Sequence, residues 1–495
     1  MSDLSRLQRR PLLTTEACFY HLARLSNIDS GELLTLASAP DPKLLSEALE
    51  HTRRAHPLSR ALLVPPRWWR RGHWLIEPAP APLIIEERTL PAGISVGAGE
   101  PSDEELSSLC AELWRRPSSL GDQVPVSLTI YRSPGSTRTF LLLRCPHFAT
   151  DAYAGARFAS DLLENYGALE RGESLAEGGQ TTSDFSGKHS DPLLRLKVSP
   201  LQKLIAALSA PLSLARDLLA PASGFGFPER PRGASRLLRI RLEEPALQRL
   251  RAAARLGGIT AHTLFSAALA RLRSHHRADA PPLRFVDLSD LRPLIAPEAR
   301  EQLACLVLPF SQTLPRAADA RGARGERALR RLMRSIQALR GGRALAEFYR
   351  LRLYVLLARC LPLEKISAGL FRWVLKTDLV TTNPGPVPFS FERCGSIPVL
   401  DFINFPNISG GARLGLIYTT FRGALRILCI ADSAALTEGE QRTLLRALTK
   451  EIEGLIEEIE EGALRPLPAR LAAPRPVSLA SFEEVATLSP QVKES

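Results

Sequence analysis

One short unit in the first third of the chain constrains its fold more than any other segment. In TRTFLLLRCPHFATDAYAGARFASDLL, a run of apolar residues predicts a strand over 139–145. Helical spacing follows over 154–168, where large apolar residues recur on one face. A strand, a short loop and a helix in this order predict a domain in which helices pack on a sheet.

Two polar residues in that loop are candidates for catalysis. His147 and Asp151 stand four positions apart, where the end of a rigid strand would hold them in place. Imidazole has an ordinary pKa that suits proton abstraction near neutral pH, and a nearby carboxylate can fix its tautomer or its loop. Simpler interpretations exist, because His147 could be a hydrogen-bonded core histidine and Asp151 could only cap the helix.

A second HxxxD sequence shows that the spacing alone is weak evidence. His275 and Asp279 have the same separation, but they end the helical stretch ALARLRSHH and stand beside Arg273 and Arg277. This context predicts a solvated helix end, whereas the first copy follows a buried strand. We therefore place the candidate base at His147.

The seven cysteines are scattered singly, without a CxxC pair or zinc-like spacing. This pattern predicts reduced thiols in a cytoplasmic protein and no metal site. Cys145 lies two residues before His147, so a nucleophilic thiol has to be weighed against an inert, buried one. Its place at the end of an apolar strand favours the inert cysteine.

The chain is basic, with a formal net charge of +12. The arginines are spread along the whole chain, and basic stretches lack interleaved aromatics, which argues against nucleic-acid binding. The charge fits an acidic partner, such as a phosphate-bearing coenzyme or an acidic carrier protein, although a bias towards arginine codons would explain it equally well. No apolar run is long enough to cross a membrane and the N-terminus lacks a secretory signal, so we expect a cytoplasmic protein.

Length and patterning predict two folded halves. We expect an N-terminal lobe over 1–169, a linker with an apolar segment over 170–235, a C-terminal lobe over 236–467 and a flexible tail over 468–495. Both lobes combine strands with helices, which predicts an α/β protein of the α+β type. We predict helices over 44–55 and 437–461 and several long helices between 324 and about 375. The predicted strands include 74–76, 83–85, 126–131, 283–288, 379–382, 414–420 and 425–431.

The segment over 193–219 is apolar and has helical spacing, and Pro200 and Pro211 are expected to break it. Three roles are open for it. It could pack on the core, cap a substrate tunnel or dock on a membrane surface, which would make the protein membrane-associated through a peripheral contact.

The strand–HFATDA–helix unit resembles the HHxxxDG active-site motif of condensation domains, wax ester synthases, alcohol acetyltransferases and mycobacterial Pap-type acyltransferases. Other segments over 10–461 resemble landmarks of that superfamily, in its order: RPLLTTEACFYHL, AHPLSR, GITAHTLFSAALARL, VDLSDLRP, TTNPGPVP and LGLIYTTFRGALRILCIAD. The chain is therefore similar to HxxxD-type acyltransferases of the chloramphenicol acetyltransferase and condensation-domain superfamily. No DFGWG motif is present, which favours the free-standing members.

The resemblance implies two chloramphenicol acetyltransferase-like lobes, each a mixed sheet with helices, and an active-site tunnel between them. An acyl thioester of coenzyme A or of a carrier protein's phosphopantetheine would meet an alcohol or amine acceptor there. His147 would act as the general base, and the acceptor would attack the thioester directly, without an acyl-enzyme. Such a protein needs no permanently bound cofactor or metal, and we expect a monomer.

Two further residues receive roles from the resemblance. The motif's aspartate is chiefly structural in this superfamily and is commonly paired with an arginine, so Arg292, in DLRP, is the candidate partner of Asp151. Arg292 could also be a surface residue before a proline. Asn383, in TTNPGP, is a candidate substrate contact, or it only shapes the turn.

Two positions depart from the motif. Pro146 replaces its first histidine, and Ala152 replaces the glycine after the aspartate. These changes keep a second function open, that of a catalytically inactive binding protein for a carrier protein or a lipid. Dependence of activity on His147 would distinguish the two.

Overall fold

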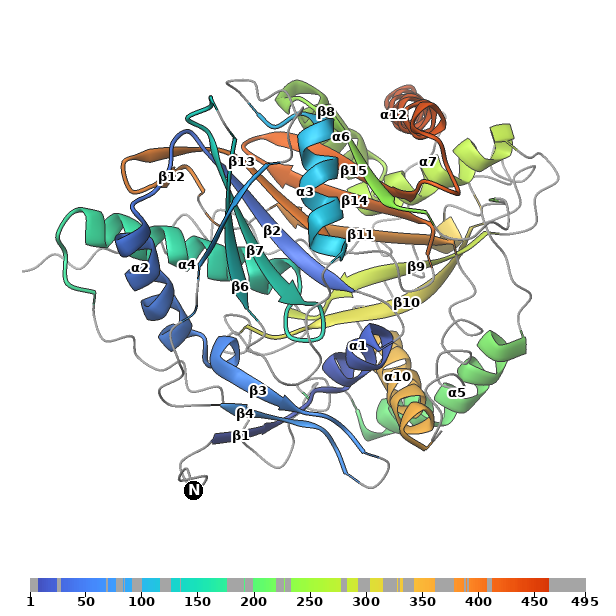
Figure 1. Ribbon diagram of the computed structural model, residues 1–495. Helices are drawn as coiled ribbons and strands as arrows, with labels where there is room; N and C mark the ends of the chain where they lie inside the picture. The colour runs from blue at the N-terminus through green and yellow to red at the C-terminus, as the bar shows by residue number, and fades with distance from the viewer. Residues whose placement is uncertain are drawn as a thin grey trace, which may run out of the picture.

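The computed structural model describes residues 8–462, apart from short gaps and longer ones at 91–99, 116–125, 176–190, 192–198, 220–226, 293–302, 315–326, 333–341 and 361–377. Within these residues the chain folds into two lobes, each built on a six-stranded sheet, and a three-stranded sheet lies beside the first (Figure 1). The predicted fold class and the two mixed lobes are confirmed. The tunnel between the lobes stays a prediction.

The first sheet belongs to the N-terminal lobe and has the strand order β12–β13–β2–β7–β6–β5. Only β5 and β6 run parallel, and the other neighbours are antiparallel. Its strands are β2 (Asp29–Leu36), β5 (Glu86–Thr89), β6 (Ser127–Arg132), β7 (Thr139–Pro146), β12 (Arg393–Cys394) and β13 (Ile397–Pro406). The three-stranded sheet has the order β1–β4–β3, from β1 (Gln8–Pro11), β3 (Ala61–Val64) and β4 (His73–Ile76).

The second sheet belongs to the C-terminal lobe and has the order β10–β9–β11–β14–β15–β8. The central strand β11 runs parallel to both neighbours, and the outer pairs are antiparallel. Its strands are β8 (Ser235–Leu242), β9 (Leu283–Asp290), β10 (Val307–Leu314), β11 (Leu379–Pro386), β14 (Leu414–Phe421) and β15 (Ala424–Asp432).

Helices cover the sheets and the junction between the lobes. The α-helices are α1 (Thr14–Ala23), α2 (Pro42–Ala55), α3 (Asp103–Arg115), α4 (Ala152–Glu170), α5 (Pro200–Leu219), α6 (Glu244–Leu256), α7 (Ala261–His276), α10 (Gly342–Cys360) and α12 (Glu438–Glu460), and a 3-10 turn, η2, spans Pro57–Arg60. Side-chain caps begin several of them: Asp41 caps α2, and Thr437 forms a capping box with Glu440 at α12. Among the residues described, no helix is long and apolar enough to cross a membrane.

Most predicted elements are found within two residues of their expected bounds, including both predicted strands of the late hairpin, β14 and β15. The strand predicted over 83–85 is wrong, because β5 lies at Glu86–Thr89 instead. It is an edge strand with mostly exposed, charged residues, so it carries no apolar signal. The break predicted at Pro211 is also wrong. Pro211 is exposed within α5, where water can satisfy the carbonyl that loses its partner.

Packing crosses the predicted boundaries of the lobes. Strand β13 comes from the C-terminal half of the chain, yet it pairs with β2 in the first sheet. Helices α5 and α10 pack with each other, and α10 packs on α1, so their buried side chains join the core of the N-terminal lobe. The division at 169 and 236 therefore stays a prediction about domains, and the predicted tail over 468–495 lies outside the described residues.

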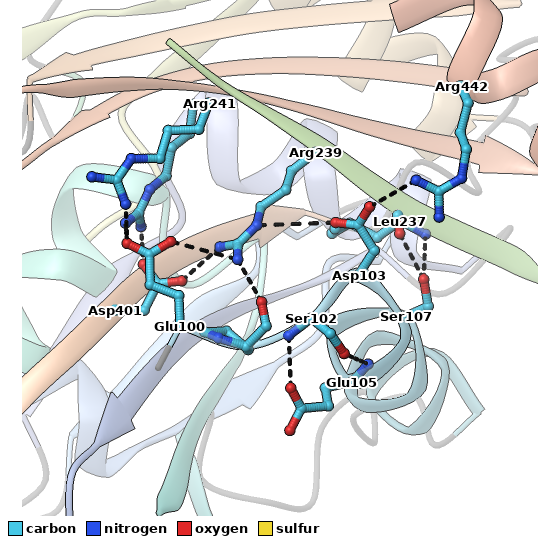
Figure 2. Close-up of polar contacts among 12 residues, drawn as sticks. Glu100, Ser102, Asp103, Glu105, Ser107, Leu237, Arg239, Arg241, Asp401 and Arg442 are labelled. Atoms are coloured by element: carbon cyan, nitrogen blue, oxygen red, sulfur yellow. Dashed lines mark hydrogen bonds and ion pairs between the residues drawn. The ribbon is translucent and has the colours of Figure 1, made fainter. Parts of the chain in front are cut away.

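The two sheets also share an apolar core. Leu33 and Leu142 of the first sheet and Ile417 and Leu428 of the second belong to one buried cluster, which α3 closes with a row of leucines. Helix α3 covers the open edge of the second sheet, where Ser107 hydrogen-bonds both backbone groups of Leu237 in β8 (Figure 2). An edge covered in this way cannot pair with another chain.

Charged side chains join the lobes beside that helix, in what we call the arginine seam. Its members are Glu100, Asp103 and Asp401 from the first lobe, and Arg239, Arg241, Arg426 and Arg442 from the second. Arg239 lies at its centre, 2.8 Å from Asp401, 3.5 Å from Glu100 and 4.0 Å from Asp103 (Figure 2). Asp401 is completely buried and also pairs with Arg426.

Candidate active site

The predicted catalytic loop joins β7 to α4 and is buried throughout. Strand β7 ends at Pro146, which pairs with Asp29 of β2, and a turn closes when the Ala149 N–H donates to the Pro146 carbonyl over 2.8 Å. Asp151 then caps α4, because its Oδ1 accepts from the Ala154 N–H at 3.0 Å. The strand end and the helix cap together fix both ends of the loop.

The imidazole of His147 is held by this loop. Its Nδ1 lies 2.9 Å from the carbonyl oxygen of Thr150, which can only accept, so Nδ1 carries the proton and Nε2 is the acceptor. Phe19 of α1 stacks on the ring with centroids 4.4 Å apart. Burial lowers the pKa of His147, against the weaker opposing effects of its hydrogen bonds and of Asp151. The ring is therefore neutral at pH 7 and presents a basic nitrogen.

Asp151 and Arg292 come from different lobes and are in contact. Nη1 of Arg292 lies 2.9 Å from Oδ2 of Asp151, and the same oxygen accepts from the Leu306 N–H at 2.7 Å. Arg292 also lies over the ring of Tyr153, 4.5 Å from its centroid. Both charged groups are almost completely buried. This pair, which we call the loop junction, ties the start of α4 to the second lobe. Among the contacts of the described residues, none joins the Asp151 carboxylate to the His147 ring.

No family model and no curated protein matches this sequence. Solved structures with a similar fold were found. A trichothecene 15-O-acetyltransferase from Fusarium sporotrichioides aligns over 92% of this chain and 96% of its own, with a TM-score of 0.70 and 15% identity. The first condensation domain of the calcium-dependent antibiotic synthetase, in complex with a substrate analogue, aligns over 93% and 97%, with a TM-score of 0.63 and 16% identity.

A third similar structure is the starter condensation domain of rhizomide synthetase in complex with C8-CoA, with a TM-score of 0.62 and 13% identity over 91% of this chain and 95% of that one. These likenesses run over nearly the whole of each chain. The chain has the fold of the chloramphenicol acetyltransferase and condensation-domain superfamily. At these identities the likeness establishes the fold and leaves the reaction to be argued from the site.

A partly buried histidine of the second lobe serves as a contrast to His147. His262, at the start of α7, is bonded through Nε2 to the buried carboxylate of Asp287, which also accepts from Thr381 at 3.0 Å. Burial acts to lower the pKa of His262, but the charge and hydrogen bond of Asp287 outweigh it and the net shift is upward. The Nε2 atom of His262 is thus bonded to a carboxylate, whereas the hydrogen bond that holds the His147 ring is made by Nδ1.

Near the site, a side chain comes close to the backbone of α4 at Gly155. It does not do so at Ala152, which stands where the motif has its glycine. A Cβ built on Gly155 would overlap Oε1 of Glu32, which projects from β2 towards α4. Glu32 is fully buried and accepts a hydrogen bond from Asn404 of β13, and burial raises its pKa well above the ordinary range. Burial therefore disfavours the charged form of Glu32, which lies against Gly155 in the first turn of α4. Its only sequence signal is a glutamate in the otherwise mostly apolar stretch GELLTL.

The thiols near the loop are buried. Burial raises the pKa of Cys145 well above its ordinary value, which argues against the nucleophilic thiol that the sequence left open. Cys305, which the sequence did not single out, lies with Sγ 3.9 Å from Nδ1 of His147, and burial raises its pKa as well. Its backbone carbonyl accepts from Thr15 at 2.6 Å, so it helps join α1 to the loop.

The remaining predicted residues lie elsewhere. Asn383 stands in a bulge of β11, because the pairing with β14 shifts between Thr382 and Gly385. The strand thus continues where the sequence suggested a turn, and bulges of this kind re-aim side chains. Contact between Asn383 and a substrate stays a prediction. Of the second HxxxD sequence, His275 lies in the last turn of α7 and Asp279 lies outside the described residues.

Proposed function

We propose that this chain is an acyltransferase that moves an acyl group from a thioester to a hydroxyl or amine acceptor, with His147 as the general base. One observation carries the proposal: Nδ1 of the buried His147 donates to Thr150, which leaves Nε2 as a basic nitrogen in a ring whose pKa is lowered. Structures of the same fold include an acetyltransferase and a condensation domain bound to C8-CoA, which supports this class of reaction.

In the proposed reaction, Nε2 of His147 takes the proton of the acceptor while the acceptor oxygen or nitrogen bonds to the thioester carbonyl carbon. The tetrahedral oxyanion then collapses, the carbon–sulfur bond breaks, and its electron pair leaves on sulfur. The imidazolium returns the proton to that thiolate. The products are an ester or amide and a free thiol, and no covalent bond to the protein forms.

The loop junction has a positioning role in this proposal. Asp151 and Arg292 do not touch the reacting atoms; they hold the helix start that follows the base. The donor is the thioester of coenzyme A or of a carrier protein's phosphopantetheine. Both carry phosphate, which suits a chain with a net charge of +12.

The first experiment measures free thiol released from short-, medium- and long-chain acyl-CoAs with pooled alcohols and amines. His147→Ala should lower the acceptor-dependent release by about 10²–10⁴-fold, because it removes the general base. His275→Ala, in the second HxxxD sequence, is the matched control and should keep the wild-type rate. Both variants should show the wild-type circular dichroism spectrum.

The alternative function gives a different result. Equal release by the wild type and His147→Ala would overturn the role of His147. If the wild type releases thiol neither from acyl-CoAs nor from acyl-loaded carrier proteins, the inactive binding protein for a carrier protein or lipid becomes the better account.

A further inference from the structure

Helix α5 presents its large apolar side chains to solvent and its small ones to the protein. More than half of the surface of each of five residues is exposed, and we call them the α5 face: Leu201, Leu204, Ile205, Leu208 and Leu212. The buried side consists largely of Ala206 and Ala210, with Leu214. A surface helix of a globular protein has the opposite arrangement.

The α5 face is continuous along the helix. Each of its residues lies three or four positions from another member of the face, so their side chains form a single stripe. Helix α10, against which α5 packs, adds two more exposed leucines, Leu356 and Leu357, near its C-terminal end. Figure 1 shows α5 at the outer margin of the molecule, on the outside of α10. A contiguous apolar surface of this kind marks an interaction site.

The basic residues in the sequences of α5 and α10 indicate what covers the face. Over 200–219 the sequence of α5 contains Lys203 and Arg216 and a single acidic residue, Asp217, and the end of α10 contains Arg352 and Arg359 and no acidic residue over 348–360. An aliphatic helix face accompanied by basic residues fits the acyl-chain and headgroup layers of an anionic bilayer. The face also lacks the aromatic residues that enrich protein–protein interfaces.

We propose that the α5 face docks this protein on the surface of an anionic phospholipid bilayer, with α5 lying in the interface. The packing connects this face to the candidate base. Helix α5 packs on α10, α10 packs on α1, and Phe19 of α1 stacks on His147. Docking through α5 therefore holds the candidate site close to the membrane surface, where a lipid-borne acyl donor or acceptor would be found. The docking itself does not depend on the proposed acyl transfer.

Flotation of the full-length protein with vesicles tests the proposal. The vesicles contain about seven parts phosphatidylcholine to three parts phosphatidylglycerol, and pure phosphatidylcholine vesicles test the charge contribution. The wild type should float with the anionic vesicles and several-fold less with the neutral ones. Leu204→Gln should lower the bound fraction several-fold, and Leu204→Gln/Leu208→Gln should lower the partition coefficient more than about tenfold, because each leucine loses its burial in the acyl chains.

Leu256→Gln is the matched control. Leu256, at the end of α6, is 54% exposed, compared with 55% for Leu204, but it is not part of the α5 face. It should float like the wild type, and all three variants should keep the wild-type unfolding midpoint because the changed side chains are exposed. His147→Ala should also float like the wild type, which separates a failure of docking from a failure of the proposed chemistry.

Several results would overturn the proposal. One is a wild type that does not float with anionic vesicles; another is a double variant that floats as well as the wild type. An equal loss in Leu256→Gln would indicate unspecific adsorption. A lipid-free wild-type dimer that Leu204→Gln/Leu208→Gln converts to monomer in sedimentation would assign the α5 face to a second copy of the chain.

Discussion

Ion pairs join the two lobes in two places, and the two places differ in the number of charged side chains that take part. At the loop junction, one arginine meets one carboxylate of the other lobe, and Asp151 and Arg292 are both almost completely buried. In the arginine seam, three carboxylates and four arginines share their bonds, and exposure rises from Asp401 at 0% to Arg442 at 46%. Arg292 also bonds Asp290 of its own lobe at 3.1 Å, but among the described residues it is the one basic side chain paired with Asp151. A network can redistribute its bonds when one member is lost, whereas Asp151 has no second described cation to replace Arg292. The tie between the lobes therefore depends on one ion pair where the candidate base must be held in place.

The largest effect is expected for Arg292→Ala. This change leaves the buried carboxylate of Asp151 without its counter-ion, at a cost of about 3–5 kcal/mol in the free energy of unfolding. The loop that follows β7 should loosen, so kcat/KM for thiol release should fall more than about tenfold even where the protein is folded. Denaturant unfolding and the thiol assay measure the two effects.

Arg292→Lys is the control for that prediction. Lysine keeps the charge but not the paired donors, so its loss of stability and of kcat/KM should lie between those of the wild type and Arg292→Ala. If Arg292→Ala kept the stability and the kcat/KM of the wild type, the loop junction would hold neither the lobes together nor the catalytic loop in place. The contrast with the arginine seam would then disappear.

A smaller effect is expected for Asp401→Ala at the centre of the arginine seam. Asp401 is buried between Arg239 and Arg426, but both arginines also lie near Glu100, which can take up part of the lost interaction. We expect a loss of about 2 kcal/mol in the free energy of unfolding. Because no member of the seam touches the catalytic loop in the described contacts, kcat/KM should stay within about twofold. A loss of activity as large as that of Arg292→Ala would contradict the comparison.

The sequence predicted the parts of this molecule whose signal is local. The strand and helix on either side of His147 and the hairpin of β14 and β15 have continuous apolar patterns, and both were found. Strand β2 was missed because Asp29, Ser30 and Glu32 are polar although all of its residues are buried. Their partners, such as Arg144 for Asp29 and Asn404 for Glu32, are 115 and 372 positions away, and no local pattern contains them.

The candidate site was predictable to a similar extent. The contact between Asp151 and Arg292 was suggested by a family resemblance, because residues 141 positions apart carry no pattern that pairs them. Phe19, Cys305 and Gly155 were missed, since each matters only through what the fold brings beside it. Helix α5 is a further example. The spacing of its residues predicts an apolar face, but it does not predict that the alanines, rather than the leucines, face α10.

The smallest effect is expected at the rim of the arginine seam. Arg442 lies 3.4 Å from Asp103 and is also bonded to Glu438 of its own helix, and it is largely open to solvent. Water and salt screen such a pair, so Arg442→Ala should change the free energy of unfolding by no more than about 0.5 kcal/mol.

A double-mutant cycle of Arg442→Ala with Asp103→Asn makes this prediction sharper, because the coupling energy isolates the pair. We expect a coupling below about 0.5 kcal/mol, measured by denaturant unfolding at moderate salt, against a coupling several times larger for Arg292 with Asp151. A rim coupling as large as that of the loop junction would mean that the seam acts as a single cooperative unit. Exposure would then be the wrong guide to which charges hold the lobes together.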